Sequence, residues 1–477
     1  MTVSSSCCND ARSPVPETVL APRAGVRLAA ASLAATLMPL NSTMVAVALP
    51  DISAEFGRDP ALVTQGLFTS YLIASVVLQS PAGKLGDRVG HARMVVAGQA
   101  LVASGALLGY LAPELWVLIV ARIAMAVGGA ALVPSAVAML RHDLPVERRG
   151  RAFGAFGAMM ALSAALGPVV GGELVETFGW RSLFAANLPV LALSVGLGVF
   201  AGSVAMQGRD APPRFDWIGT GLLAGGLTAI ILGLRPDGQH LSLVLIGVAL
   251  LVPFGWWERR AADPVVAFSL FRSVPFAAGA FLIAVQNLVM YALMLQVTLV
   301  AAALFDLDAR GTGRLIVSMM LAMVITSPVA GRLSDRVGPR SIALAGSVSG
   351  LLGLAGLAWI DLTAPEQLAI PLILLGMGIG LTAPAAQSAS MSAVARDLAG
   401  TAAGLGATMR YLGGIIGVAI LSVLLDVHGT RTEVISEHRT LMAVYAGALL
   451  VGLVCAALLP GRSRAVVHVE GTDPPIA

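Results

Sequence analysis

Two arginines, Arg122 and Arg410, lie inside long runs of apolar residues. A guanidinium at membrane depth costs at least about 2.5–3.5 kcal/mol, so such residues face an interior cavity or a partner. A cation held there can balance a proton that moves nearby, contribute to the potential of a cavity, or be anchored by backbone carbonyls. For Arg122 we expect proton coupling or cavity electrostatics, with a structural anchor as the alternative. For Arg410 cavity lining and a structural role stand as equal alternatives.

A charged segment occurs twice, at 83–93 and 331–340. Both copies read G-x-L-x-D-R-V-G, and Asp87 and Asp335 are equivalent positions 248 residues apart. Glycine permits a tight turn between two helices. An aspartate can accept hydrogen bonds from the N-terminus of a neighbouring helix, and arginines can pair across the same face. We interpret the segment as a latch, with a turn that carries only orientation charges as the alternative; its residues are Gly83, Asp87, Arg88, Gly90, Arg93, Asp335 and Arg336.

A third pattern, Gly167, Pro168, Gly171 and Gly172, falls within another apolar run. These residues remove side-chain bulk and one backbone donor, which permits a bend and the close approach of a neighbouring helix. We expect a bend or a close helix contact there, and a packing face without directional meaning is the alternative.

Several polar residues within apolar runs could line a cavity. Asn287, Tyr291 and Met294 share one helix face at i, i+4 and i+7, and such amides, phenols and thioethers suit an amphiphilic molecule without fixed geometry. Hydrogen bonds between helices explain any single one equally well. The full candidate set is Asn41, Tyr71, Gln286, Asn287, Tyr291, Met294, Gln387 and Arg410.

The elements that carry these residues must be membrane-spanning helices. Of 477 residues, 57% are apolar, a further 53 are glycine and only 12% are charged, about half the charged share of soluble proteins. Apolar runs of about 20 residues recur about fourteen times, twice the length of transmembrane β-strands and without their alternation. The chain is therefore predicted to be an all-α membrane protein with 14 spans.

The duplicated segment divides the chain into two parallel six-helix bundles, at 28–203 and 275–460, with a linker at 204–274 that contributes two extra transmembrane helices. Lysine and arginine concentrate in alternate connecting segments. The positive-inside rule then predicts that both tails, 1–27 and 461–477, are cytoplasmic. We expect a multi-pass protein of the plasma (inner) membrane.

The motifs resemble those of a known family. Gly83–Arg93 resembles the signature of the major facilitator superfamily, Arg122–Ala130 resembles its fourth-helix motif, and Gly167–Gly172 resembles the G-P-x-x-G-G motif associated with antiporters. Gly179–Pro189 is similar to the start of the sixth helix in the fourteen-span drug:proton antiporter branch. The resemblance implies the major facilitator fold and alternating access, with the latch joining the two halves when the outside is open. It also implies that the Gly167, Pro168, Gly171 and Gly172 motif is a hinge or seal specific to export.

The first apolar run departs from the pattern of that branch. Asn41 stands where the family usually has a mid-membrane aspartate, and an amide cannot take up a proton near neutral pH. The nearest acids, Asp51, Glu173 and Glu176, lie toward the external ends of their helices. We expect Arg122, Glu173 and Asp51 to be the proton-coupling candidates, and a solvated carboxylate at a helix end is the alternative for Glu173.

We therefore expect a secondary transporter, not an enzyme, that exports hydrophobic drug- or antibiotic-like molecules in exchange for protons. Two buried cations without a mid-span acid favour neutral, zwitterionic or anionic substrates. The alternative is a proton-independent facilitator or importer of a small metabolite. A membrane enzyme or lipid-handling protein is a more distant alternative, because no cluster of His, Asp, Ser or Cys occurs at one membrane face.

The expected partners are the small-molecule substrate, protons and the lipid bilayer, without nucleic acid, and the chain is expected to act as a monomer. The composition and motifs predict no cofactor and no metal site. The 6 histidines are all expected in loops or tails, and no G-x-x-x-x-G-K-[ST] loop for ATP occurs.

Overall fold

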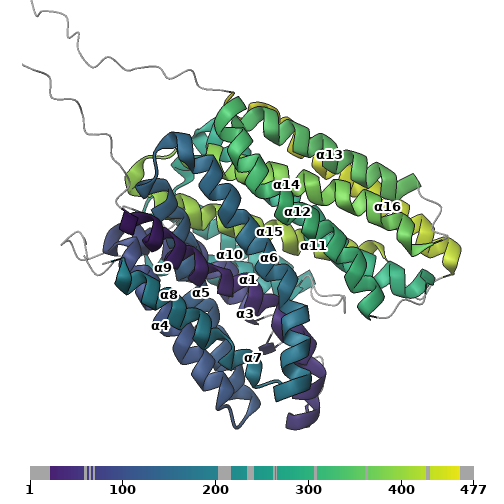
Figure 1. The fold of residues 1–477 in the computed structure, drawn as a ribbon, viewed down its shortest axis with the longest axis horizontal. Coiled ribbons are helices and arrows are strands. Elements are labelled where there is room, and N and C mark those ends of the chain that lie inside the picture. The colour runs from purple at the N-terminus through teal and green to yellow at the C-terminus, as the bar shows by residue number, and fades with distance from the viewer. Residues whose placement is uncertain are drawn as a thin grey trace, which may run out of the picture.

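The computed structural model describes residues 22–58, 62–63, 66–67, 70–201, 216–233, 241–261, 264, 266–305, 309–359, 364–425 and 430–461. These residues form helices joined by short turns (Figure 1). In this way each backbone N–H and C=O within a span is paired along its own helix, as hydrocarbon surroundings require. Apart from 22–27 and Gly461, the two predicted tails lie outside the described residues.

The first group of helices comprises α1 (Pro22–Phe56), α3 (Ser70–Val89), α4 (His91–Tyr110), α5 (Leu115–Asp143), α6 (Val146–Phe178), α7 (Ser182–Ala185) and α8 (Asn187–Phe200). The second comprises α11 (Val274–Phe305), α12 (Ala309–Val337), α13 (Pro339–Trp359), α14 (Ala369–Ser392), α15 (Ala399–Leu424) and α16 (Arg431–Leu458). Figure 1 shows the purple-to-teal group and the green-to-yellow group as two bundles side by side. Short 3₁₀ turns, η2 (Phe268–Arg272), η3 (Pro365–Leu368) and η4 (Arg396–Leu398), precede α11, α14 and α15.

The predicted count of fourteen spans is not confirmed. Within the described residues, 11 helices are long and apolar enough to cross a membrane, or up to 12 if the bent α6 is one span. The helix α3 carries Lys84, Asp87 and Arg88 near its end, which shortens its apolar part, and Trp217–Ile230 is a shorter apolar helix. The all-helical membrane architecture is nevertheless clear.

An additional pair, α9 (Trp217–Gly233) and α10 (Leu241–Glu258), lies between the two groups in sequence. The two helices approach closely at Gly226 and Gly247, where a Cβ on Gly247 would lie 2.7 Å from the Gly226 carbonyl oxygen. Asp216 caps α9 by accepting a hydrogen bond from the Gly219 amide at 2.8 Å, and it also accepts one from the Trp257 indole at 3.1 Å. These bonds join the start of α9 to the end of α10.

The duplicated segments are helical over most of their length, which corrects the expectation of loops. The helix α3 continues to Val89 and α12 continues to Val337. Only the last glycine of each copy turns the chain, because Gly90 has φ 96° and Gly338 has φ 94°. These are left-handed conformations that side chains disfavour, so one residue reverses the direction of the chain between two spans.

The expectation that every histidine lies in a loop or tail is wrong. His438 lies inside α16 and is 2% exposed, with its two ring nitrogens next to Gln296 and the Leu357 carbonyl. His91 is the first residue of α4, and His142 lies in the last turn of α5. Among the described residues, no group of three His, Cys, Asp or Glu is placed to hold a metal ion.

Candidate functional site

Asp87 joins the two bundles at one end of the molecule. Its carboxylate accepts hydrogen bonds from the backbone amides of Gly400 and Thr401, each at 2.6 Å, and from the Thr401 hydroxyl at 2.7 Å. Both amides belong to the first turn of α15, where N–H groups lack partners within the helix and the dipole favours an anion. The sequence predicted a carboxylate at a helix N-terminus, and the structure identifies that helix as α15.

Glycines bring the backbones of α3 and α15 into contact beside this carboxylate. A Cβ on Gly83 would lie 2.1 Å from the Gly400 carbonyl oxygen, and one on Gly404 would lie 2.3 Å from the Gln79 carbonyl oxygen. No side chain fits at either distance. Gly83 therefore serves close approach between the bundles, and the turn itself depends on Gly90.

Asp335 repeats the arrangement from the opposite bundle. Its carboxylate accepts hydrogen bonds from the backbone amides of Gly150 at 2.8 Å and Arg151 at 2.9 Å, one turn into α6. A Cβ on Gly331 would lie 2.2 Å from the Gly150 carbonyl oxygen. The two copies of the motif thus make equivalent contacts across the molecule, and we call the end that holds Asp87 and Asp335 the latch end.

The arginines of the motif are placed differently from the aspartates. Arg93 donates to the Val89 carbonyl at 3.5 Å within its own bundle, and Arg336 is exposed. Arg88 is half-buried at the end of α3. Arg141, which the sequence analysis did not select, donates to the carbonyls of Met391 at 2.6 Å and Val394 at 2.8 Å in the other bundle. A single arginine at a helix end gives no sequence signal that separates such a contact from an orientation charge.

Lys84 connects the latch helix to the additional pair. Its ammonium donates to the Pro264 carbonyl at 2.5 Å, and its side chain is largely buried beyond the apolar part of α3. Burial, together with the smaller effect of the Arg88 charge, lowers the Lys84 pKa from 10.5 to about 8, although the charges of Glu258 and Asp216 oppose the shift. The segment after α10 is therefore held against the latch, a contact that the sequence analysis did not predict.

Arg122 is fully buried in the first bundle. Its Nε donates to the Leu67 carbonyl and one Nη donates to the Asn41 carbonyl, each at 3.3 Å. Its guanidinium carbon lies 4.1 Å from the centre of the Tyr71 ring, a cation–π distance. The other Nη has no hydrogen-bond partner, and no carboxylate pairs with this guanidinium among the described residues.

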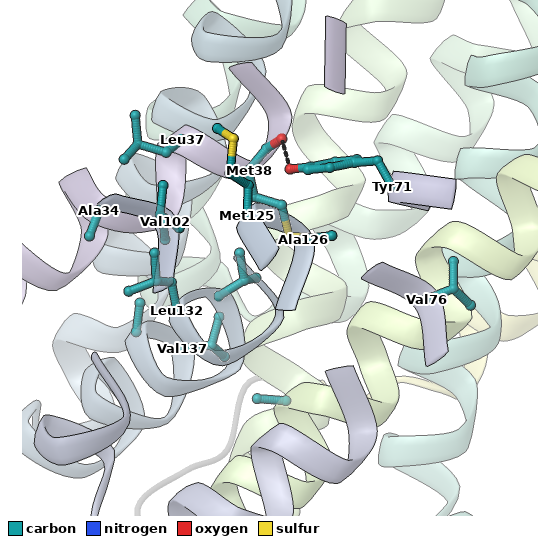
Figure 2. Packing of buried hydrophobic residues seen from close by; sticks show 14 of the residues in the cluster. Ala34, Leu37, Met38, Tyr71, Val76, Val102, Met125, Ala126, Leu132 and Val137 are labelled. Carbon is teal, nitrogen blue, oxygen red and sulfur yellow. Dashed lines mark hydrogen bonds between the residues drawn. The ribbon is translucent and has the colours of Figure 1, made fainter. Parts of the chain in front are cut away.

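Tyr71 and Asn41 surround Arg122 and are themselves buried. The Tyr71 hydroxyl donates to the Met38 carbonyl at 2.9 Å, and Figure 2 shows this bond beside Met125 and Ala126. The Asn41 amide donates to the Asn187 side-chain oxygen at 2.7 Å, and the Asn187 amide donates to the carbonyls of Leu183 and Phe184 in the preceding helix α7. At the position where the resembling family usually has an aspartate, this chain thus has Asn41, whose amide is paired with that of Asn187. Asn187 lies within the Gly179–Pro189 motif, but the sequence alone does not predict it as a site residue.

The two carboxylate candidates lie away from this centre. Glu173 is exposed in the second half of α6, and Asp51 is exposed near the end of α1. Neither is brought to Arg122. Their exposure agrees with the alternative of solvated carboxylates at helix ends.

In the second bundle, Arg410 and Gln387 come together. One Nη of Arg410 donates to the Gln387 side-chain oxygen at 3.4 Å, and both residues are half-buried. On α11, Tyr291 packs against α15, because a Cβ on Gly414 would lie 2.7 Å from the Tyr291 ring. Asn287 donates to the Ile283 carbonyl at 2.8 Å within its own helix.

Two other members of the α11 set differ in burial. Gln286 is buried, and its side-chain oxygen has no partner among the described residues, whereas Met294 is half-buried. The eight cavity candidates are therefore divided between the bundles, with Asn41 and Tyr71 in the first and the other six in the second.

The Gly-Pro segment lies at a change of direction in α6. The helical segments Arg148–Ala164 and Val169–Phe178 differ in direction by 41°. Gly167 and Gly171 face α1: a Cβ on Gly167 would lie 1.8 Å from the Thr43 hydroxyl, and one on Gly171 would lie 3.1 Å from the Met44 carbonyl. Gly172 is half-buried, and the side chain of Pro168 lies outside the described residues.

A further cluster lies at the end opposite the latch. The Glu55 carboxylate accepts hydrogen bonds from the Trp180 indole and from Arg181, each at 2.5 Å, and Arg181 also donates to the Ala112 carbonyl. The bond from Trp180 and the charge of Arg181 lower the Glu55 pKa against the effect of burial. This cluster ties α1 and α6 to the connection between α4 and α5.

The amino-acid sequence is similar to those of known membrane transporters. The sequence model of the Major Facilitator Superfamily matches residues 31–418. An MFS-type transporter of Bacillus subtilis (strain 168), YvkA, is 34% identical over 403 residues, which cover 83% of this chain and 89% of the relative.

Two further relatives are named for export or resistance. The tetracenomycin C resistance and export protein of Streptomyces glaucescens is 29% identical, and the multidrug resistance protein Stp of Mycobacterium tuberculosis is 30% identical. Each match covers 83% of this chain and 75% of the relative.

Solved structures share the fold. The human organic anion transporter MFSD10 superposes with a TM-score of 0.65 at 14% identity, over 91% of this chain and 100% of that one. The proton:xylose symporter XylE gives a TM-score of 0.62 at 12% identity, over 91% and 94%. Identities this low support the arrangement of helices alone.

Proposed function

Because this chain belongs to the major facilitator superfamily of transporters, we propose that it exports hydrophobic drug- or antibiotic-like molecules by alternating access, in exchange for protons. The observation that carries the proposal is the pair of equivalent latches. Asp87 and Asp335 each bind the backbone of a helix in the other bundle, at the same end of the molecule. Relatives named for tetracenomycin C export and multidrug resistance support the direction of transport.

The latch end is the end that the distribution of arginine predicts to be cytoplasmic. With both latches engaged, this arrangement would be the state that is closed toward the cytoplasm. Release of the two carboxylates would let the bundles separate there and admit substrate from inside. The bend of α6 at Gly167–Gly172 would serve as the hinge, since its glycines allow α6 to move against α1 without side-chain interference.

The charge around Arg122 bears on the substrate. Within the part of the chain that the structure describes, its guanidinium is buried without a carboxylate partner and one Nη is unpaired. An uncompensated cation repels a second cation in a medium of low dielectric constant. Together with Arg410 it favours neutral, zwitterionic or anionic substrates, and vigorous export of organic dications would contradict this preference.

One observation favours a second candidate, a facilitator without proton coupling. Asn41 and Asn187 form a buried pair of amides where a titratable aspartate would stand, and neither amide can carry a proton near neutral pH. If coupling does occur, Arg122 would have to contribute by a change in its hydrogen bonds, and Glu173 or Asp51 would have to take up the proton from solvent.

One experiment separates the candidates. The chain is expressed in a pump-deficient bacterium, and everted vesicles with an internal pH dye are supplied with tetracenomycin C. Export with protons predicts a substrate-dependent pH change, loss of resistance in Arg122→Ala, and a gain or an altered range in Asn41→Asp. Arg272→Ala, an exposed arginine after α10, is the matched control and should behave as wild type. Resistance with a silent pH trace favours the facilitator, and an unchanged profile in both centre variants removes the assigned coupling site.

A further inference from the structure

The outer face of α10 carries a groove that the transport cycle does not use. The groove has a volume of about 610 Å³ and is lined by Leu251, Val252, Gly255, Trp256, Arg259 and Arg260. All six residues belong to α10 or to the turn that follows it, so the groove runs along one helix. A Cβ on Gly255 would meet nothing within 4 Å, which leaves the floor of the groove open.

The side of α10 that carries this groove faces away from the rest of the protein. Only 17% of the residues in the apolar part of α10 are buried, the lowest share among the candidate spans of the described residues. Val252 is 68% exposed and Trp256 is 59% exposed. At helical spacing they continue a stripe of exposed apolar side chains that begins with Leu241, Leu245 and Val248. A surface of this kind, on a membrane helix, is covered by lipid acyl chains.

The end of the groove is cationic. Arg259 and Arg260 are both exposed, and the Arg260 guanidinium lies 4.0 Å from the centre of the Trp256 ring. Stacking on an indole holds a guanidinium in place while its N–H edge stays free for an anion. Two adjacent arginines below an apolar stripe match a molecule that has a phosphate at one end and hydrocarbon at the other.

We propose that this groove binds an anionic phospholipid, with the phosphate held by Arg259 and Arg260 and one acyl chain along Trp256, Val252 and Leu245. The two arginines of the groove directly follow Glu258, whose carboxylate accepts a hydrogen bond from the Val266 amide. Two residues away, the Pro264 carbonyl accepts the hydrogen bond from Lys84 of the latch helix. The bound lipid would therefore lie beside the segment that holds the additional helix pair to the latch.

The test uses the full-length protein and two lipids with identical chains, dioleoylphosphatidylglycerol and dioleoylphosphatidylcholine. Native mass spectrometry measures the dissociation constant of the first bound lipid. Each arginine near a membrane surface contributes about 1 kcal/mol toward an anionic lipid. Two of them predict a preference of about 30-fold for the glycerol lipid over the choline lipid. Arg259→Gln with Arg260→Gln should abolish that preference, whereas Arg272→Gln, exposed at the same end of the fold, should retain it.

A second measurement locates the lipid. Phosphatidylglycerol with dibrominated chains should quench tryptophan fluorescence, and Trp256→Phe should remove most of that quenching, while Trp359→Phe, on α13, should not. The double arginine variant changes only exposed side chains, so its thermal midpoint in phosphatidylcholine should equal that of wild type. Equal affinity for the two lipids, an unchanged preference in the double variant, or a dimer through α10 that excludes lipid would overturn the proposal.

Discussion

At the scale of single residues, the two aspartates of the repeated motif do what the sequence predicts. Asp87 and Asp335 accept hydrogen bonds from helix amides in the opposite bundle. The repeat identified the aspartates, because two identical patterns 248 residues apart indicate that both copies have the same structural role. Their partners, Gly400 and Gly150, could not be predicted, because a backbone amide leaves no trace in the side-chain pattern.

The strength of the first latch can be tested at Asp87. Asp87→Asn removes the charge that faces the first turn of α15 and retains one acceptor oxygen. We expect a loss of about 1.5–3 kcal/mol, the usual contribution of hydrogen bonds to a charged group, seen as a lower midpoint of thermal unfolding in detergent. Thr401→Val is the matched control, since it removes only the hydroxyl bond to the same carboxylate, and it should cost about 0.5–1.5 kcal/mol. Equal midpoints for Asp87→Asn and wild type would show that the latch does not hold the bundles.

Other residues of the site gave no usable sequence signal. Arg141 and Lys84 donate hydrogen bonds to backbone carbonyls that are distant in the sequence, and nothing near them in the sequence distinguishes them from orientation charges. His438 lies inside α16, which begins at Arg431, although the polar first turns of this helix resemble a connecting segment in the sequence. Arg122 was selected correctly as a buried cation, because charge within an apolar run is costly wherever its partner lies.

At the scale of helices, the contact between α3 and α15 depends on glycine. The backbone of Gly404 meets that of Gln79 with no room for a side chain, whereas a Cβ on Gly406 would meet nothing within 4 Å. The sequence shows both as glycines in one apolar run, so the distinction between them belongs to the fold. The ends of helices were predicted less well than their existence. The helices α3 and α12 continue through the two charged segments, although charged residues of this kind indicate loops.

These two glycines form a matched pair for mutation. Gly404→Ala should force α15 away from α3 and destabilise the closed latch by about 1–3 kcal/mol, the usual cost of overpacking. Gly406→Ala, two residues along the same helix, should be neutral or stabilising by up to about 1 kcal/mol, because alanine is the better helix former. Thermal midpoints and transport rates of the two variants check this. If both variants behaved alike, the close approach of α3 and α15 would not exist in the membrane.

At the scale of the whole molecule, the duplication read from the sequence corresponds to a structural symmetry. The two bundles exchange equivalent contacts at the latch end, where Arg141 adds a third connection. Membership of the superfamily follows from the match over residues 31–418. The number of spans is predicted less well than the family, because hydropathy measures the length of an apolar run but not the point where a helix leaves the membrane.

The central claim is that the bundles are joined at the latch end in this state and must separate there for transport. Two spin-label pairs test it, in a chain whose own cysteines are replaced: His142→Cys with Ala393→Cys at the latch end, and Thr177→Cys with Thr432→Cys at the opposite end. The four positions are exposed at the ends of α5, α14, α6 and α16.

Distances between the labels are measured by pulsed electron paramagnetic resonance, with Asp87 intact and in Asp87→Asn. The intact chain should give a short, narrow distribution at the latch end. Asp87→Asn should lengthen that distribution and shorten the one at the opposite end, as two bundles that rock about a shared centre require. Distances that lengthen together at both ends, or that do not respond at all, would contradict the account.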